Sequence, residues 1–187
     1  MDVIQTSISA FLLREQPFER FRFARWQSAL AITLLGILAG LGPQGMPSPE
    51  VPELPVLPLW GRLAFGVLSM WLALLIIHGF CRWWLKRGGR WDGQGDLLNL
   101  IVASWLVVDA LGFLLTFLGV PEMLVTPVWI YSLWVSANAM SGAIPKASLG
   151  YGVGGIILGT ILAVVVIAIL SAGLMLGAGG MPSPAAG

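Results

Sequence analysis

The sequence predicts an all-α protein, a polytopic transmembrane bundle of five helices. Three observations support this fold class: 57% of the 187 residues are hydrophobic, only 10% are charged, and the apolar residues come in long blocks. A soluble domain carries roughly 25% charged residues, so this chain has too few for a surface in water. A membrane-spanning helix needs about 20 apolar residues, which the blocks approach or exceed. Most of the chain is therefore expected to face lipid or its own interior.

Residues 1–25 are expected to form a cytoplasmic amphipathic arm ahead of the membrane domain. From Phe11 to Trp26 the sequence mixes aromatic residues with arginine and glutamate. This composition is typical of a segment that lies in the lipid headgroup layer rather than crossing the bilayer. An arm that docks onto a partner protein is the alternative.

The five spans are predicted within a membrane domain over residues 26–177, at 26–41, 59–85, 97–118, 123–142 and 149–176. The first span is the shortest, and it is identified by the four arginines before it and by a following loop without Lys or Arg. Six prolines between Pro43 and Pro58 predict an extended loop near polyproline II. Residues 178–187 are predicted to form a short non-cytoplasmic tail.

The orientation follows from the distribution of Lys and Arg. Nine of the ten lie before the first span, between spans two and three, or between spans four and five, whereas Arg62 alone lies on the other side. Lys and Arg accumulate in short cytoplasmic loops. We therefore expect an integral protein of a bacterial cytoplasmic (inner) membrane, with its N terminus inside and its C terminus outside.

The glycine-rich stretch KRGGRWDGQGD (residues 86–96) is predicted to be a cytoplasmic turn. It lacks the Lys-Ser or Lys-Thr of a phosphate-binding loop and the third glycine of a dinucleotide fingerprint. Asp96 is expected to cap the third span. The basic residues around the inner interface are predicted to contact lipid headgroups or a partner; they are Arg20, Arg22, Arg25, Lys86, Arg87 and Arg90.

Asp109 is the one ionisable residue predicted to lie deep in a span, which makes it a candidate functional residue. Hydroxyl groups from three other spans are expected at the same depth, on Ser69, Tyr131, Ser132 and Thr160. The favoured interpretation is a structural polar clamp, in which these hydroxyls hydrogen-bond a protonated carboxyl. A role in ion or proton passage is the alternative. His78 is expected nearer the interface, in reach of water.

Small residues predict where helices approach closely. The patterns Gly36-x-x-x-Gly40 and Gly155-x-x-x-Gly159, together with Gly152, are typical of helix packing in membranes. Packing within the bundle is favoured over a homodimer contact.

Enzymatic chemistry is not predicted. One histidine and one cysteine give no triad and no metal-ligand spacing, so we assign no catalytic, cofactor-binding or metal-binding residue and expect no cofactor. The net charge of +1 argues against a nucleic-acid partner. Membrane lipids and a membrane-protein partner or a second copy of the chain are the expected partners.

The order of these features resembles the Yip1 family, particularly its short prokaryotic members. The likeness rests on Leu-Lys-Arg-Gly-Gly-Arg-x-x-x-x-x-Asp-Leu-Leu at 85–98 and on Val-Trp-Ile-Tyr-Ser-Leu-Trp at 128–134, followed by a Lys-containing turn and a last apolar span. The resemblance implies a helical integral membrane protein without known enzymatic chemistry. Eukaryotic relatives act in vesicle trafficking and bind Rab-type GTPases, but the Asp-Leu-Tyr-Gly-Pro motif of those proteins does not occur here.

Two functions are carried forward from the sequence. The first is a non-enzymatic membrane-organising or protein-interaction component, with an accessory subunit of a larger membrane complex as one form of it. The second is a small permease or ion-coupled carrier in which Asp109 is the coupling carboxylate.

Overall fold

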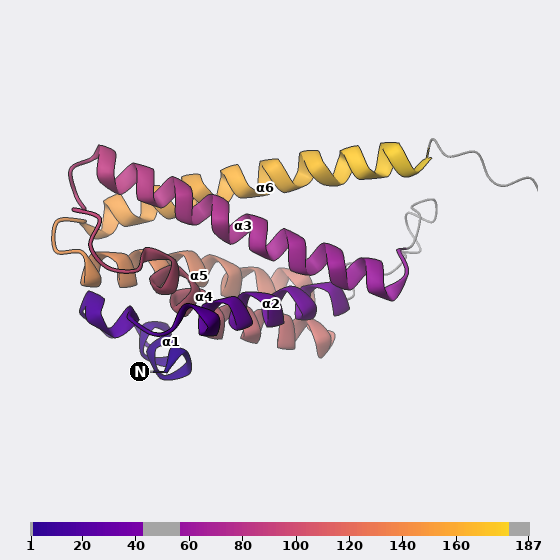
Figure 1. Ribbon diagram of the computed structural model, residues 1–187. Coiled ribbons are helices and arrows are strands. Elements are labelled where there is room, and N and C mark those ends of the chain that lie inside the picture. The colour runs from indigo at the N-terminus through magenta and orange to yellow at the C-terminus, as the bar shows by residue number, and fades with distance from the viewer. Residues whose placement is uncertain (1, 43–56, 180–187) are drawn as a thin grey trace, which may run out of the picture.

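Helix α4 (Leu97–Phe117) lies at the centre of the fold (Figure 1). The computed structural model describes residues 2–42 and 57–179, and this part of the chain is helical without strands. Around α4 pack α1 (Val3–Phe11), α2 (Arg25–Leu41), α3 (Leu59–Arg87) and α5 (Glu122–Ala143). Helix α6 (Leu149–Gly179) packs instead on α3 and α5, and a short 3-10 turn, η1 (Phe18–Phe21), precedes α2. The all-α class is confirmed.

Four helices are long and apolar enough to span a membrane, not the five that the sequence predicts. These are α3, α4, α5 and the stretch of α6 from Leu149 to Gly173. Helix α2 has only 17 residues, about 25 Å at 1.5 Å per residue, against a hydrocarbon core of about 30 Å. It ends before Pro43, and Arg62 of α3 donates hydrogen bonds to the carbonyl oxygens of Leu41 and Gly42 (3.4 and 2.8 Å). A fifth span is therefore not confirmed.

The ends of the helices have local causes. Asp96 accepts a hydrogen bond from the backbone N–H of Asn99, so the expected cap of α4 is formed. Helix α3 ends at Arg87, and Gly89 and Gly93 in the following loop have positive φ (62° and 90°), a conformation that glycine adopts without steric cost. Helix α5 ends at Ala143, two residues before Pro145, because the residue preceding a proline disfavours helical backbone.

The arm, which is expected to lie in the headgroup layer, has a helix of its own. It begins with a nine-residue helix, α1, capped by Asp2, and this helix packs on α4 and α5. After α1 the chain turns at Leu13, which has φ 54°, and returns through η1 to α2. Ala10 of α1 packs with Val108 and Val135. The expected outer loop and tail fall largely on residues 43–56 and 180–187, which lie outside the described residues.

Glycines allow three pairs of helices to approach closely. A Cβ added at Gly36 or Gly40 of α2 would lie 2.6 Å from backbone atoms of α3, and Gly66 of α3 faces both. Gly152 of α6 faces the Ala137 backbone of α5. Gly155 and Gly159 of α6 face α3, the former at the indole of Trp84. All five glycines that the sequence marks for packing thus lie at contacts between helices of this one chain.

Candidate functional site

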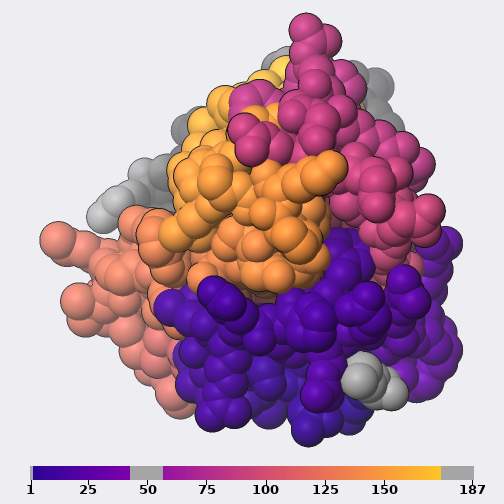
Figure 2. Space-filling view, turned by 90° about the vertical axis from the view of Figure 1, so that its left-hand side faces the viewer, coloured from indigo at the N-terminus to yellow at the C-terminus, as the bar shows by residue number. Residues whose placement is uncertain are grey.

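The basic side chains gather at one end of the bundle, which we call the basic end. It is the end where α3 and α5 finish and where α2, α4 and α6 begin. Figure 2 looks onto it: the arm (indigo), the chain at the end of α3 (magenta) and the α5–α6 turn (orange) meet there. Its basic residues are all exposed; they are Arg14, Arg20, Arg22, Arg25, Arg82, Lys86, Arg87, Arg90 and Lys146.

A polar network holds the arm and α2 on the start of α4. Asn99 is fully buried, and its Nδ2 donates to the carbonyl oxygens of Phe21 (2.9 Å) and Phe23 (2.8 Å). Its Oδ1 accepts a hydrogen bond from the Ser28 hydroxyl at 2.7 Å. The Arg25 Nε lies 3.0 Å from Asp96 Oδ2, the one ion pair among the described residues. The arm and α2 are therefore joined to the α4 N-terminus by buried hydrogen bonds.

Helices α3 and α6 are joined at the same end by a reciprocal pair of hydrogen bonds. The Tyr151 hydroxyl donates to the Trp84 carbonyl oxygen (2.7 Å), and Trp84 Nε1 donates to the Tyr151 carbonyl oxygen (3.2 Å). The two rings stack with centroids 5.0 Å apart. Arg90 lies over the other side of this pair, its guanidinium carbon 5.3 Å from the Tyr151 ring centroid.

Aromatic rings hold several of the cationic groups at the surface. Lys86 Nζ lies 5.9 Å from the ring centroid of Trp91, and the Arg87 guanidinium lies 5.4 Å from that of Trp83. Such cation–π contacts fix the side chain while the charged group stays in reach of water or an anion. The positive charges of Lys86, Arg87 and Arg90 therefore lie next to aromatic rings at the surface.

A cleft of about 360 Å³ lies where the arm, the α3–α4 loop and the α5–α6 turn meet. Each segment contributes one cation to it: Arg22, Arg90 and Lys146. Phe18 and Trp91, whose rings stack at 6.4 Å, form part of its apolar lining. Arg90 Nη1 donates to the Lys146 carbonyl oxygen at 3.0 Å and so links two of the segments. Carboxylates of Glu19 and Asp92 also line the cleft, so its charge is mixed rather than purely positive.

The hydrogen-bonded cluster expected around Asp109 is not formed. Asp109 is 6% exposed on α4, and no described residue gives it a hydrogen bond. The hydroxyl of Tyr131 donates to the Phe11 carbonyl oxygen (2.6 Å), and that of Ser132 donates to the Trp129 carbonyl oxygen (2.7 Å). The Thr160 hydroxyl is buried without a partner among the described residues, and the structure gives Ser69 no hydrogen bond to Asp109. Tyr131 holds the arm, which is a role that the sequence does not reveal.

The sequence did not reveal the roles of the residues in the polar network around Asn99 or of the Trp84–Tyr151 pair that joins α3 and α6. The sequence does mark Asn99 in one way, because it is an amide that lies inside an apolar run, three residues after a capping aspartate. It does not mark Trp84 or Tyr151, because their pairing depends on how α3 and α6 are rotated. His78 is half-buried on α3, and no described residue gives it a hydrogen bond.

Comparisons with protein-family models, with curated proteins and with solved structures find no match to this chain. The resemblance to the Yip1 family therefore has no support from them.

Proposed function

We propose that this protein is a non-enzymatic membrane-organising component that gathers anionic lipid headgroups, and through them partner proteins, at its basic end. The observation that carries the proposal is the basic end itself: nine exposed cations, of which only Arg25 is paired with a carboxylate of the described chain. Cations next to a membrane surface attract anionic lipids, each contributing about 1 kcal/mol. The proposal assigns no catalytic residue.

The surroundings of the cations support a lipid interface. Trp83, Trp84 and Trp91 lie at the end of α3 and in the loop after it, and tryptophan is enriched where a membrane meets water. Arg62, the basic residue near the opposite end, is used as a cap for α2. Under the rule that short cytoplasmic loops are positive, the basic end lies on the cytoplasmic side, and the first apolar helix, α2, lies within the membrane beside α3.

The test is lipid enrichment around the full chain in bilayers. Energy transfer is measured from the tryptophans to a dye on either an anionic lipid, phosphatidylglycerol, or a zwitterionic one, phosphatidylcholine. We expect stronger transfer to the anionic lipid, and the excess should shrink with salt, because screening weakens attraction between exposed charges. Equal transfer to both lipids at low salt would contradict the proposal.

A partner in a larger complex is tested separately. Gentle detergent extraction followed by mass spectrometry identifies chains that copurify with the protein. We expect membrane proteins that are lost when Arg22, Arg90 and Lys146 are replaced by glutamine. A protein that migrates alone from native membranes would remove the basis for the accessory-subunit interpretation.

A second candidate function, an ion-coupled carrier, is favoured by one observation. Asp109 lies on the central helix, buried and without a hydrogen bond from the described chain. Buried carboxylic groups in a membrane are costly and commonly serve ion or proton passage. The measurement is proton flux into liposomes that contain the protein, with Asp109→Asn as the variant and Asp92→Asn, in an exposed loop, as its control. Flux that is lost only in Asp109→Asn would support the carrier, and no flux in the unaltered protein would reject it.

A further inference from the structure

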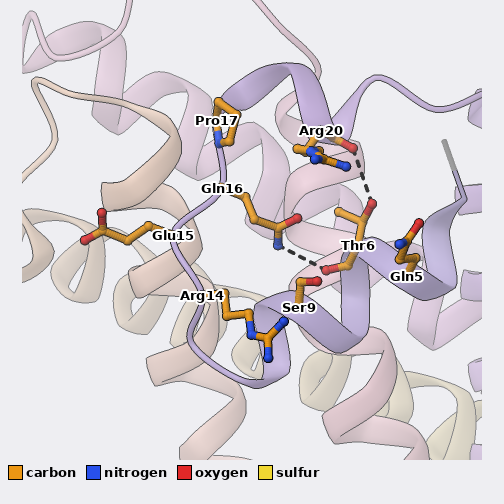
Figure 3. A pocket seen from close by; sticks show the side chains of 8 residues that line it. All are labelled: Gln5, Thr6, Ser9, Arg14, Glu15, Gln16, Pro17 and Arg20. Carbon is orange, nitrogen blue, oxygen red and sulfur yellow. Dashed lines mark hydrogen bonds between the residues drawn. The ribbon is translucent and has the colours of Figure 1, made fainter.

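The arm encloses a small pocket against α1, which we call the arm pocket (Figure 3). Its volume is about 270 Å³, and polar side chains of residues 5–20 line it. The chain reaches it by the left-handed turn at Leu13, after which the Arg14 backbone N–H donates to the Ser9 carbonyl oxygen (3.0 Å). The pocket is therefore formed by one continuous segment that folds back on itself.

Hydrogen bonds fix the walls of the arm pocket. Gln16 Nε2 donates to the Thr6 carbonyl oxygen at 3.2 Å, and the Thr6 hydroxyl is shared between the carbonyl oxygens of Asp2 (3.1 Å) and Arg20 (3.3 Å). The contacts of Thr6 with Gln16 and Arg20 are drawn in Figure 3. They tie α1 to the returning chain, so the backbone around the pocket is held in place before a ligand enters.

Four side chains that line the pocket carry hydrogen-bond donors that no other described residue accepts. The side chains of Gln5, Ser9, Arg14 and Arg20 form no hydrogen bond or ion pair with another described residue. Figure 3 shows Arg14 and Arg20 on opposite sides of Thr6, with the carboxylate of Glu15 turned away from both. The lining of the pocket therefore carries two guanidinium groups, an amide and a hydroxyl; it also includes Glu15, whose carboxylate does not lie between the arginines.

This set of donors matches a phosphate group. A guanidinium binds phosphate oxygens through two parallel hydrogen bonds, and two guanidiniums suit a group with several anionic oxygens better than a single carboxylate. An amide and a hydroxyl supply further donors. The ligand class is thus a phosphate ester rather than a carboxylic acid or a cation.

The apolar face of α1 indicates where that phosphate comes from. Ile4, Ile8 and Leu12 are 57%, 47% and 52% exposed, and their spacing of four places them on one side of the helix. Helix α1 packs on α4 and α5 through its buried face, which includes Ser7 and Ala10, so the apolar stripe is turned away from the bundle and is free to contact lipid. An exposed apolar stripe next to a cationic pocket is typical of a segment that lies at the boundary between acyl chains and headgroups.

We propose that the arm pocket binds the phosphate of one anionic phospholipid between Arg14 and Arg20, while Ile4, Ile8 and Leu12 contact its acyl chains. This inference rests on the proposed function only in placing the basic end at a membrane surface. It adds one saturable site to the general attraction of the other cations. The Arg14 side chain, which forms no hydrogen bond within the described chain, thereby has a ligand-binding role.

Native mass spectrometry of the full chain in mild detergent tests the site. Phosphatidylglycerol and phosphatidylcholine are titrated separately, and the affinity for the first bound lipid is measured. We expect a preference for phosphatidylglycerol that falls about ten-fold in Arg14→Gln/Arg20→Gln, the loss of charge-assisted hydrogen bonds to one phosphate. The matched control is Arg82→Gln/Arg87→Gln, which removes the same charge from the basic end outside the pocket; because it removes only general attraction, it should lower that affinity clearly less than the Arg14/Arg20 pair does.

The other outcomes of this experiment distinguish between the explanations. Equal loss in both pairs, or no loss in the Arg14/Arg20 pair, would overturn the arm pocket while leaving general enrichment at the basic end intact. No preference for phosphatidylglycerol in the unaltered chain would instead reject the proposed function. Glycerol phosphate or inorganic phosphate that competes as well as the lipid would reject a lipid ligand. Circular dichroism of each variant confirms that the helices are retained, and Arg14→Lys/Arg20→Lys should bind with intermediate affinity because it keeps the charge but not the planar fork.

Discussion

The half of the bundle next to the basic end and the opposite half are held together by different forces. Near the basic end the buried amide of Asn99 joins the arm, α2 and α4 by hydrogen bonds, and the Trp84–Tyr151 pair joins α3 and α6. In the opposite half α2 and α3 meet closely at glycines and through the Arg62 hydrogen bonds to the end of α2, and α6 is mostly exposed from 164 to 173. Figure 1 shows α6 leaving the other helices toward its C-terminal end. Buried hydrogen bonds therefore dominate at the end that carries the loops, and close packing at glycines dominates at the other.

The largest effect is expected from Asn99→Leu at the basic end. The substitution removes three hydrogen bonds and leaves the carbonyl groups of Phe21 and Phe23 without their buried partner. We expect the free energy of unfolding to fall by about 3 kcal/mol, because each lost buried bond costs about 1 kcal/mol. Equilibrium unfolding in mixed micelles measures it. Asn138→Leu, which removes a single 3.3 Å bond to Leu13, is the control and should cost less than about 1 kcal/mol.

The next effect is expected where α2 and α3 touch. A Cβ at Gly66 would overlap the carbonyl oxygen of Gly36 and lie 2.7 Å from the nitrogen of Gly40. Gly66→Ala should therefore cost about 2 kcal/mol by forcing the two helices apart. Gly79→Ala on the same helix is the control, since no atom lies within 4 Å of its added Cβ. That change should stabilise α3 by up to about 1 kcal/mol, and a loss of stability there would show that the glycine contacts are not the cause.

A smaller and local effect is expected from Tyr131→Phe. It removes the 2.6 Å hydrogen bond from the tyrosine hydroxyl to the Phe11 carbonyl oxygen, at a cost of about 1 kcal/mol. The arm should open more often, so trypsin should cleave after Arg14 faster than in the unaltered protein. Tyr151→Phe removes a hydroxyl bond of similar length between α3 and α6 and should leave the cleavage rate unchanged. Equal acceleration in both variants would mean that the arm opens only with the whole bundle.

The smallest effect is expected from Ile169→Ala on the exposed part of α6. Ile169 is 65% exposed, so the substitution should change the free energy of unfolding by no more than about 0.5 kcal/mol. Ile156→Ala on the same helix is the comparison, because Ile156 is fully buried and its truncation should cost at least about 2 kcal/mol. A large effect at Ile169 would show that this face is covered by another chain.

The sequence predicts the helices well because composition alone determines them. The expected spans at 59–85, 97–118 and 123–142 differ from α3, α4 and α5 by no more than two residues at either end. Helix α2 also begins and ends within one residue of its expected bounds, but hydropathy does not decide whether so short a helix spans. Helix α1 was missed although Asp2 is a good N-cap and Val3, Ser7 and Ala10 recur at helical spacing.

Which side chains meet in a helical bundle depends on their depth along each helix and also on the rotation of each helix about its axis. The cluster around Asp109 was assembled from depth alone, and the structure turns the hydroxyls of Tyr131 and Ser132 to backbone carbonyls instead. Packing glycines can be predicted without knowing this rotation, since glycines spaced four residues apart lie on one face of their helix. The hydrogen bonds of Asn99 could not be predicted from the sequence, because their partners lie 71 to 78 residues away in the chain.

The anchoring of the arm on α5 has a consequence for the order of events during synthesis. Tyr131 holds the Phe11 carbonyl and Asn138 holds that of Leu13, at separations of 120 and 125 residues. At about 5 to 20 residues per second, a ribosome needs on the order of ten seconds to make the intervening chain. These contacts therefore cannot form until nearly every other helix has been synthesised, and the arm is held on α5 only at that late stage.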